Sequence, residues 1–300
     1  MKKLETKSGF VAIVGRPNVG KSTLLNHILG FKLSITSRKP QTTRHRILGI
    51  FTRDQLQMIF VDTPGLNDLN EGQTSAMGRF MNHQAVGVLS DVDICLHVVD
   101  ARGWRDEDEA VVPHLTSTNV RSICALNKVD RVHPKPKLLP MMKLVSEKYS
   151  YEEIIPISAL KNDGLDVLVD QLGQRIPNGP HLYAEDEITD RPVRFLVAEM
   201  IREKVVRQLG DELPYRTTVV VESFAAREKV TAIDAIIYVE KESQKGIVIG
   251  KAGSRLKSIG QASRQSIESF LNRQVFLKIV VRVHRDWTNE RLALASLGYR

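Results

Sequence analysis

The chain has 300 residues and a net charge of +8, with 42% hydrophobic and 26% charged residues. The length suggests about two domains, and the composition is typical of a soluble globular protein. No apolar run approaches the ~20 residues that a membrane-spanning helix needs, and the N-terminus lacks a secretory signal, which predicts a cytoplasmic protein. Cys95 and Cys124 lie in apolar runs, so we expect buried, reduced thiols. The histidines show no zinc-ligand spacing.

Apolar runs alternate with amphipathic stretches over residues 1–176. Helical patterns separate most of these runs, which predicts an α/β domain with a mostly parallel sheet. Only residues 52–55 join the second and third runs, so these two strands should form an antiparallel hairpin at the edge of the sheet. The predicted strands are residues 10–14, 47–51, 56–61, 94–100, 121–126 and 153–158.

The second part of the chain has a different order of elements. Residues 177–193 are rich in proline, glycine and acidic residues without any period, which indicates an interdomain linker. Residues 194–300 then predict an α+β domain with the order helix, strand, strand, helix, helix, strand. Its predicted elements are a helix at 194–209, strands at 217–224 and 232–240, two helices around a glycine break within 247–271, a strand at 275–283 and a terminal helix within 289–299.

A glycine-rich stretch, GRPNVGKST, follows the first strand and precedes a helix. It fits the pattern G-x-x-x-x-G-K-[ST], in which glycines let backbone N–H groups wrap around phosphate oxygens. Lys21 should reach the β- and γ-phosphates, and the Ser22 hydroxyl should bind Mg²⁺. We therefore predict a nucleotide-binding loop made of Gly15, Arg16, Pro17, Asn18, Val19, Gly20, Lys21, Ser22 and Thr23.

Three later motifs, FVDTPGL, CALNKVD and PISAL, also come at strand ends, where ligands bind in open α/β sheets. In the first, Asp62 can hold Mg²⁺ through water, and Gly65 can turn its N–H toward the γ-phosphate. In the second, the Asp130 carboxylate can accept from the two adjacent donors of guanine, whereas adenine would leave it unpaired. The predicted contacts are Asp62, Thr63, Pro64, Gly65, Asn127, Lys128, Asp130, Ser158, Ala159 and Leu160.

Two of these contacts have specific roles. The aliphatic stem of Lys128 can lie over the flat base, and the backbone N–H of Ser158 or Ala159 can meet guanine O6. The four motifs resemble the G1, G3, G4 and G5 boxes of translation-factor-type GTPases. This resemblance implies that Thr42 or Thr43, with Thr43 favoured, closes onto Mg²⁺ and the γ-phosphate in the GTP state. The threonine loop and the stretch Gly65–Met77 are then the expected switch segments.

The resemblance assigns Lys21, Thr43 and Gly65 to catalysis, with one departure. Many small GTPases carry a water-orienting glutamine at the position of Leu66, which cannot orient water. We therefore expect slow intrinsic hydrolysis that depends on a partner or a cation. Asn18 resembles the asparagine that holds K⁺ in potassium-activated GTPases. The alternative is that Asn18 serves loop geometry, because asparagine tolerates unusual backbone angles.

The net positive charge lies at the C-terminal end of the chain. Residues 241–300 hold 12 lysines and arginines against 4 acidic residues, whereas residues 1–240 are balanced. A G-x-x-G stretch lies here between two helical patterns, and such a stretch lets a nucleic-acid backbone approach closely. Together with the element order this resembles a type II KH domain. The predicted RNA contacts are Gly250, Lys251, Ala252, Gly253, Arg255 and Lys257.

Other residues of this segment have less specific interpretations. The apolar residues around the glycines line a groove or, for most of them, fill the core. Arg282, His284 and Arg285 contact RNA or are simply solvated, and the sequence favours neither. Trp287 is expected to be a packing anchor rather than a stacking platform for bases.

The combination of the GTPase motifs with the KH pattern and the ending LGYR resembles the Era family of bacterial GTPases over the whole chain. The resemblance implies a monomer that works in small (30S) ribosomal subunit assembly. Its KH domain would hold single-stranded RNA near the 3′ end of 16S rRNA, and some of it would associate peripherally with the inner membrane. The alternative is a membrane-associated signalling GTPase whose basic domain binds lipid headgroups. A metabolic P-loop kinase is disfavoured, because N-K-x-D selects guanine.

Overall fold

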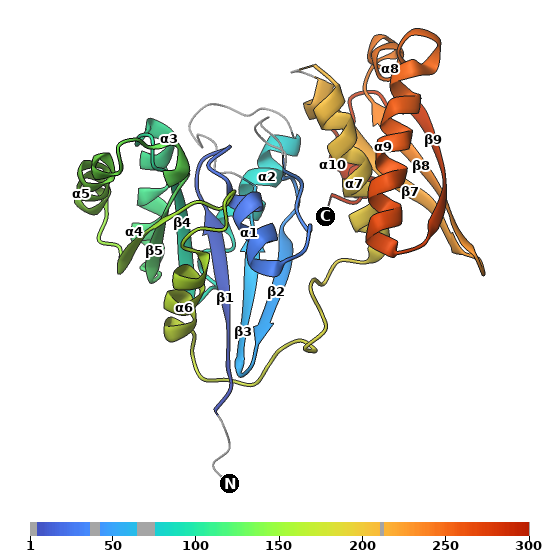
Figure 1. Cartoon of the computed structure of the whole chain (residues 1–300). Helices are drawn as coiled ribbons and strands as arrows, with labels where there is room; N and C mark the ends of the chain where they lie inside the picture. Colours follow the sequence, from blue (N-terminus) through green and yellow to red (C-terminus); the bar gives the residue numbers. More distant parts are fainter. Residues whose placement is uncertain (1–4, 37–42, 65–75, 211–212, 300) are drawn as a thin grey trace. The chain divides into compact units, whose positions relative to one another are not determined.

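The computed structural model describes residues 5–36, 43–64, 76–210 and 213–299 (Figure 1). The chain divides into two compact units, one that ends at Asp190 and one whose main part begins at Arg191. Much of the segment that we expected to be a linker is bonded to the first unit. The Thr6 hydroxyl donates to the Gly179 carbonyl at 2.8 Å, and the N–H of Leu182 donates to Gln57 Oε1 at 2.7 Å. The domain boundaries stay a prediction.

The first unit is built on a six-stranded sheet with the order β2-β3-β1-β4-β5-β6. Every neighbouring pair is parallel except β2 and β3, which form an antiparallel hairpin at one edge. The predicted fold class is therefore confirmed. The strands are β1 (Lys7–Val14), β2 (Ile47–Arg53), β3 (Leu56–Asp62), β4 (Ile94–Asp100), β5 (Ser122–Asn127) and β6 (Glu153–Ile157).

Helices cover both faces of this sheet (Figure 1). The central strands are buried along most of their length, which is why they read as continuous apolar runs rather than alternating ones. Both cysteines lie in these strands as buried free thiols, as expected. The helices are α1 (Lys21–Leu29), α2 (Ala76–Val86), α3 (Asp106–Glu109), α4 (Val112–Thr118), α5 (Leu138–Lys148) and α6 (Leu165–Arg175), with 3₁₀ turns at Val129–Arg131 and Lys135–Lys137.

Three strands of the sheet end in a polar residue. Asp62, Asp100 and Asn127 are the last residues of β3, β4 and β5. These strands run parallel to β1, whose own end at Val14 leads into the glycine-rich loop. Because the carboxyl ends of parallel strands meet at one edge of the sheet, the fold gathers these side chains around the loop.

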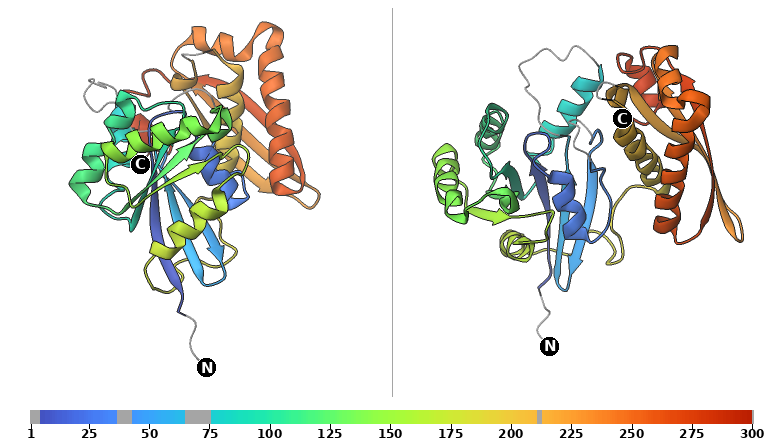
Figure 2. Two further views of the ribbon diagram at one scale, coloured as in Figure 1. Left: turned by 60° about the vertical axis from the view of Figure 1, so that its left-hand side comes forward. Right: turned by 45° about the horizontal axis from the view of Figure 1, so that its top comes forward.

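The second unit is an α+β domain around the sheet β7-β8-β9, with β7 and β8 antiparallel and β8 and β9 parallel. Helices α7 and α9 pack on one face of this sheet (Figure 2), where alternate residues of β8, including Ile233 and Ile237, form the core with Ile201 and Ile259. The elements are α7 (Val193–Gln208), β7 (Thr217–Ala226), β8 (Val230–Val239), α8 (Glu242–Ile249), α9 (Ser254–Leu271), β9 (Gln274–Val283) and α10 (Arg291–Ser296), with 3₁₀ turns at Leu213–Arg216 and Lys251–Gly253.

The end of the chain is anchored in this second unit. Trp287 is fully buried and stacks on Tyr299, with 5.8 Å between the ring centroids. The Tyr299 hydroxyl lies 2.9 Å from Thr218 Oγ1. Trp287 is thus a packing anchor, as the sequence indicated. Across the parts of the chain that the structure describes, no helix has both the length and the apolar character needed to cross a membrane.

Candidate functional site

The loop between β1 and α1 can only be closed by glycines at its two ends. Gly15 has φ +142°, and a Cβ there would lie 2.4 Å from the Val98 carbonyl oxygen. Gly20 has φ +109°, and a Cβ there would lie 2.4 Å from Asn127 Nδ2. Both positions therefore combine a backbone angle that favours glycine with a contact that excludes any side chain. Between them the loop presents its backbone N–H groups at the start of α1, where anions bind.

Lys21, the first residue of α1, is almost fully buried, with 7% of its surface exposed. Its Nζ donates to the carbonyl oxygens of Gly15 at 2.7 Å and Arg16 at 3.0 Å. Burial lowers the pKa of Lys21 to about 8, although nearby Asp62 and Asp108 raise it. The ammonium is thus held over the loop, where a bound phosphate would supply the charge that favours its protonated form.

Three oxygen-bearing side chains converge next to this lysine. Ser22 Oγ lies 3.2 Å from Thr43 Oγ1 and 3.2 Å from Asp62 Oδ2. Asp62 is fully buried, burial raises the pKa of its carboxyl, and its Oδ1 has no hydrogen-bond partner among the residues that the structure describes. Hydroxyl and carboxylate oxygens are ligands that Mg²⁺ prefers, and a cation would satisfy the orphaned oxygen. The residues present therefore fit Mg²⁺, directly or through water.

The remaining residues predicted near the phosphates follow β3 or precede Thr43. The Thr63 hydroxyl is buried and donates to the Ile13 carbonyl at 3.1 Å, so this side chain fastens the loop after β3 to β1. Pro64 follows it. Gly65, with its predicted contact to the γ-phosphate, lies outside the described residues, as do Leu66 and Thr42. The choice between Thr42 and Thr43 stays a prediction, although Thr43 lies beside Ser22.

Asn127 connects the three loops of the site. Its Nδ2 donates to the Val19 carbonyl at 2.8 Å, and its Oδ1 accepts from the N–H groups of Lys128 at 2.8 Å and Ala159 at 2.9 Å. Both N–H groups that we predicted to meet guanine O6 are therefore already donated, that of Ala159 to Asn127 and that of Ser158 to the Asp163 carbonyl at 2.9 Å. A contact with O6 would require one of these N–H groups to be shared between two acceptors.

The base-recognition residues are also held in place by one another. Asp130, in the turn Val129–Arg131, accepts a hydrogen bond from the Ser158 hydroxyl at 2.6 Å. Lys128 donates from Nζ to the Asn18 carbonyl in the glycine-rich loop. Leu160 follows Ser158 and Ala159 in the loop after β6, and 59% of its surface is exposed. The residues of the N-K-x-D and S-A motifs are thus brought together, as predicted.

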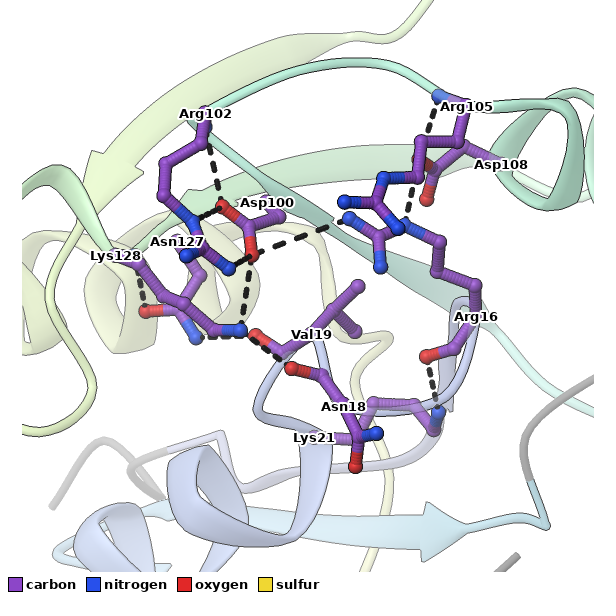
Figure 3. Close-up of polar contacts among 10 residues, drawn as sticks. All are labelled: Arg16, Asn18, Val19, Lys21, Asp100, Arg102, Arg105, Asp108, Asn127 and Lys128. Carbon is purple, nitrogen blue, oxygen red and sulfur yellow. Dashed lines mark hydrogen bonds and ion pairs between the residues drawn. The ribbon is translucent and has the colours of Figure 1, made fainter. Parts of the chain in front are cut away.

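Three charged residues outside the predicted motifs, Asp100, Arg102 and Asp108, surround the loop. Asp100, at the end of β4, binds Arg102 and Lys128, and Asp108 in α3 binds the side chain of Arg16 (Figure 3). Arg16 was predicted as a phosphate contact, but its guanidinium donates from Nε to Asp108 at 2.9 Å. Asp100 could have been noticed, because it ends a strand as Asp62 and Asn127 do.

The G-x-x-G loop of the second unit joins α8 to α9 with an unusual backbone. Gly250, Ala252 and Gly253 have φ of +73°, +48° and +76°. A Cβ at Gly250 would lie 2.8 Å from Arg255 Cβ, whereas a Cβ at Gly253 would meet no atom of the described residues within 4 Å. Gly253 therefore leaves open space at the start of α9, as close approach of a ligand backbone requires.

The cations around this loop differ in their availability. Lys251 and Lys257 are exposed, but Arg255 is half-buried and donates from Nη1 to the Ile247 carbonyl at 2.6 Å. Arg255 therefore closes the loop against α8. On β9, Arg282 Nη1 lies 3.3 Å from Glu222 Oε1, so this arginine is paired within the sheet.

Fold and site together define a P-loop protein with an N-K-x-D motif beside its glycine-rich loop, followed by an α+β domain with a G-x-x-G loop. The family model of the 50S ribosome-binding GTPases matches residues 10–128, and the KH domain model matches residues 212–288.

Relatives match the whole chain. GTPase Era of Azotobacter vinelandii is 50% identical and that of Ectopseudomonas mendocina 49% identical, each covering 98% of this chain and 97% of the relative. A variant of Aquifex aeolicus Era bound to GDP·AlF₄⁻ has a TM-score of 0.94 at 39% identity, covering 98% of this chain and 99% of that one. Era in complex with MgGDPNP and nucleotides 1506–1542 of 16S ribosomal RNA gives the same values. The chain belongs to the Era family and is a GTPase.

The first prediction concerns the base. Asp130→Asn removes the carboxylate that accepts from two guanine donors, so affinity for GDP should fall by about 2–3 kcal/mol, or roughly 30- to 150-fold. Affinity for XDP should rise, because xanthine carries a carbonyl oxygen in place of the exocyclic amine. Competition titrations with a fluorescent nucleotide measure both. Asp166→Asn, an exposed carboxylate on α6, is the control. Unchanged GDP affinity in Asp130→Asn would contradict the assignment.

The second prediction concerns pH. Because the pKa of Lys21 is lowered to about 8, the free protein loses this charge above pH 8, and nucleotide binding must then take up a proton. Affinity for GDP should be constant from pH 6.5 to 7.5 and should fall above pH 8, approaching about tenfold per pH unit. Lys21→Arg keeps its charge over this range and should lack the break. The same break in both proteins would assign it to another group.

Proposed function

We propose that the chain is a GTP-hydrolysing, RNA-binding switch in small (30S) ribosomal subunit assembly, which binds the 3′ region of 16S rRNA through its KH domain. The observation that carries this proposal is the G-x-x-G loop, with open space at Gly253 and exposed lysines on either side. The likeness to Era bound to nucleotides 1506–1542 of 16S ribosomal RNA supports it over almost the full chain. Ribosomal subunits assemble in the cytoplasm, where we expect the protein to act.

The RNA part of the proposal rests on the local shape of the loop. KH domains clamp about four single-stranded nucleotides by bringing the nucleic-acid backbone against the glycine loop. Lys251 and Lys257 would contact phosphates, which contributes affinity but no base identity. The same cations could attract lipid headgroups, and this remains the second candidate. Charge alone suffices for that attraction, whereas the backbone at Gly250–Gly253 fits a close approach by a nucleic acid.

The nucleotide part rests on the oxygen cluster beside the glycine-rich loop. Ser22, Thr43 and Asp62 would hold Mg²⁺, which neutralises charge on the β- and γ-phosphates when bound. Lys21 would hold the same phosphates. GTP would order the Thr42/Thr43 loop and the segment Gly65–Met77, and hydrolysis would release them. We propose that RNA and GTP binding are coupled through these segments, so each would tighten the other.

Hydrolysis is proposed to be slow in the absence of a partner, because Leu66 occupies the position of the water-orienting glutamine. Asn18 would hold K⁺ beside the phosphates. It is exposed and has φ +63°, an angle that asparagine tolerates better than most residues. This backbone angle also fits a purely geometric role, so the two explanations require a direct test.

The third prediction tests RNA binding. Gly253→Asp places a negative side chain in the open space of the loop, so affinity for a single-stranded RNA with the 3′ sequence of 16S rRNA should fall at least about 30-fold. Gly298→Asp is the matched control, because Gly298 also has positive φ and nothing within 4 Å of its Cβ position. Fluorescence anisotropy measures both. Equal RNA affinity in the two variants, with both still binding anionic vesicles, would favour the lipid alternative.

The fourth prediction tests the cation. GTP turnover should be several-fold faster in K⁺ than in Na⁺ at equal ionic strength, because a K⁺ beside the phosphates offsets the developing charge. Asn18→Ala should remove this difference, so that its turnover in K⁺ equals its turnover in Na⁺. Phosphate release under multiple turnover measures it. Equal wild-type rates in the two salts would leave Asn18 with a role in loop geometry only.

A further inference from the structure

The carboxylate of Asp100 lies at the centre of a charged network outside the predicted motifs (Figure 3). Its side chain is 1% exposed. It accepts hydrogen bonds from Arg102 Nε at 2.9 Å and Nη2 at 2.7 Å, and from Lys128 Nζ at 2.9 Å. Although burial raises the pKa of Asp100, these hydrogen bonds hold it well below its usual value. The carboxylate is therefore ionised at any working pH.

Lys128 has a second hydrogen-bond partner besides Asp100. The same ammonium donates to the Asn18 carbonyl in the glycine-rich loop. Lys128 also has φ +69°, an uncommon conformation for a residue with a long side chain. Its backbone is bonded to Asn127 Oδ1 at one end, and its ammonium is bonded to two acceptors at the other. The methylene stem between them is thereby fixed.

A second buried carboxylate orders the same loop from another side. Asp108 is fully buried and accepts from Arg16 Nε at 2.9 Å and from the Arg105 N–H at 3.0 Å. Arg16 Nη2 lies 3.9 Å from Asp100 Oδ2. Asp100 is thus the point where cations from the glycine-rich loop and from the N-K-x-D motif meet.

A buried carboxylate is costly unless cations compensate it, and an apolar residue would fill the end of β4 without that cost. Here the compensating groups come from two nucleotide-binding segments. These contacts hold the glycine-rich loop and the N-K-x-D motif together. Ligands bind more tightly to sites whose groups are already immobilised.

We propose that Asp100 is a positioning residue for guanine nucleotides. It holds the Lys128 ammonium so that the lysine stem presents a fixed surface to the base, and it joins this surface to the glycine-rich loop. The proposal rests on the proposed nucleotide site, since Lys128 must lie over the base for its position to matter. Asp100 itself touches no nucleotide and acts through Lys128.

A double-mutant cycle on the full chain tests this role, with dissociation of fluorescent GDP measured by stopped flow. Asp100→Asn keeps the shape of the side chain and removes its charge, so GDP should dissociate about tenfold faster, as expected for the loss of a charge-assisted hydrogen bond. Lys128→Met should have a similar effect. The double variant should be no faster than the faster single variant, because both changes remove one interaction. A purely structural effect of Asp100 would multiply with that of Lys128→Met.

Each outcome has a defined consequence. The proposal would be overturned if the two substitutions multiplied their effects on the rate of GDP dissociation, or if Asp100→Asn left that rate unchanged. Neither result would affect the proposed nucleotide site. Wild-type protein that fails to bind GDP would instead overturn the proposed nucleotide site. If Asp100→Asn does not fold, Asp100→Ser, which is smaller and cannot overpack, is used in the same cycle. Asp106→Asn, an exposed carboxylate of α3, should dissociate GDP at the wild-type rate.

Discussion

The hydrogen bond from Asn127 Nδ2 to the Val19 carbonyl fixes the distance between the loop predicted to receive phosphate and the residues predicted to read the base. The strands β1 and β5 that carry these two segments are not neighbours, because β4 lies between them. A nucleotide spans a fixed length from base to phosphates, so both ends can bind only if this spacing is right. Gly20 makes the bond possible, because a side chain there would collide with Asn127.

Electrostatics imposes the second constraint on the site. Lys21, Asp62, Asp100 and Asp108 are all buried in or beside a loop that must also accept a highly charged ligand. The charges of Asp100 and Asp108 are compensated within the protein by Arg16, Arg102 and Lys128, so these carboxylates do not rely on water that a nucleotide would displace. Among the described residues, Asp62 Oδ1 and Asp108 Oδ1 have no hydrogen-bond partner. The Asp62 oxygen suits a cation.

The sequence predicted the parts of this molecule that depend on local patterns. The six strands, the edge hairpin and the order of the KH elements follow from apolar periodicity and loop length. The contact between Asp100 and Lys128 could not be predicted in the same way. It joins the last residue of β4 to the residue that follows β5, and these two ends meet only because the strands pair in the sheet. Likewise, no local signal shows that the Ala159 N–H is donated to Asn127, or that Ala252 adopts a left-handed backbone.

We expect one site to select guanine through Asp130 while the glycine-rich loop holds the phosphates. Competition of GTP and ATP for the wild-type protein, titrated against one fluorescent guanine nucleotide in Mg²⁺, tests it most directly. The account predicts that GTP competes at least about 100-fold more strongly than ATP, because adenine would leave the Asp130 carboxylate desolvated and unpaired. Equal competition by the two nucleotides would contradict the account.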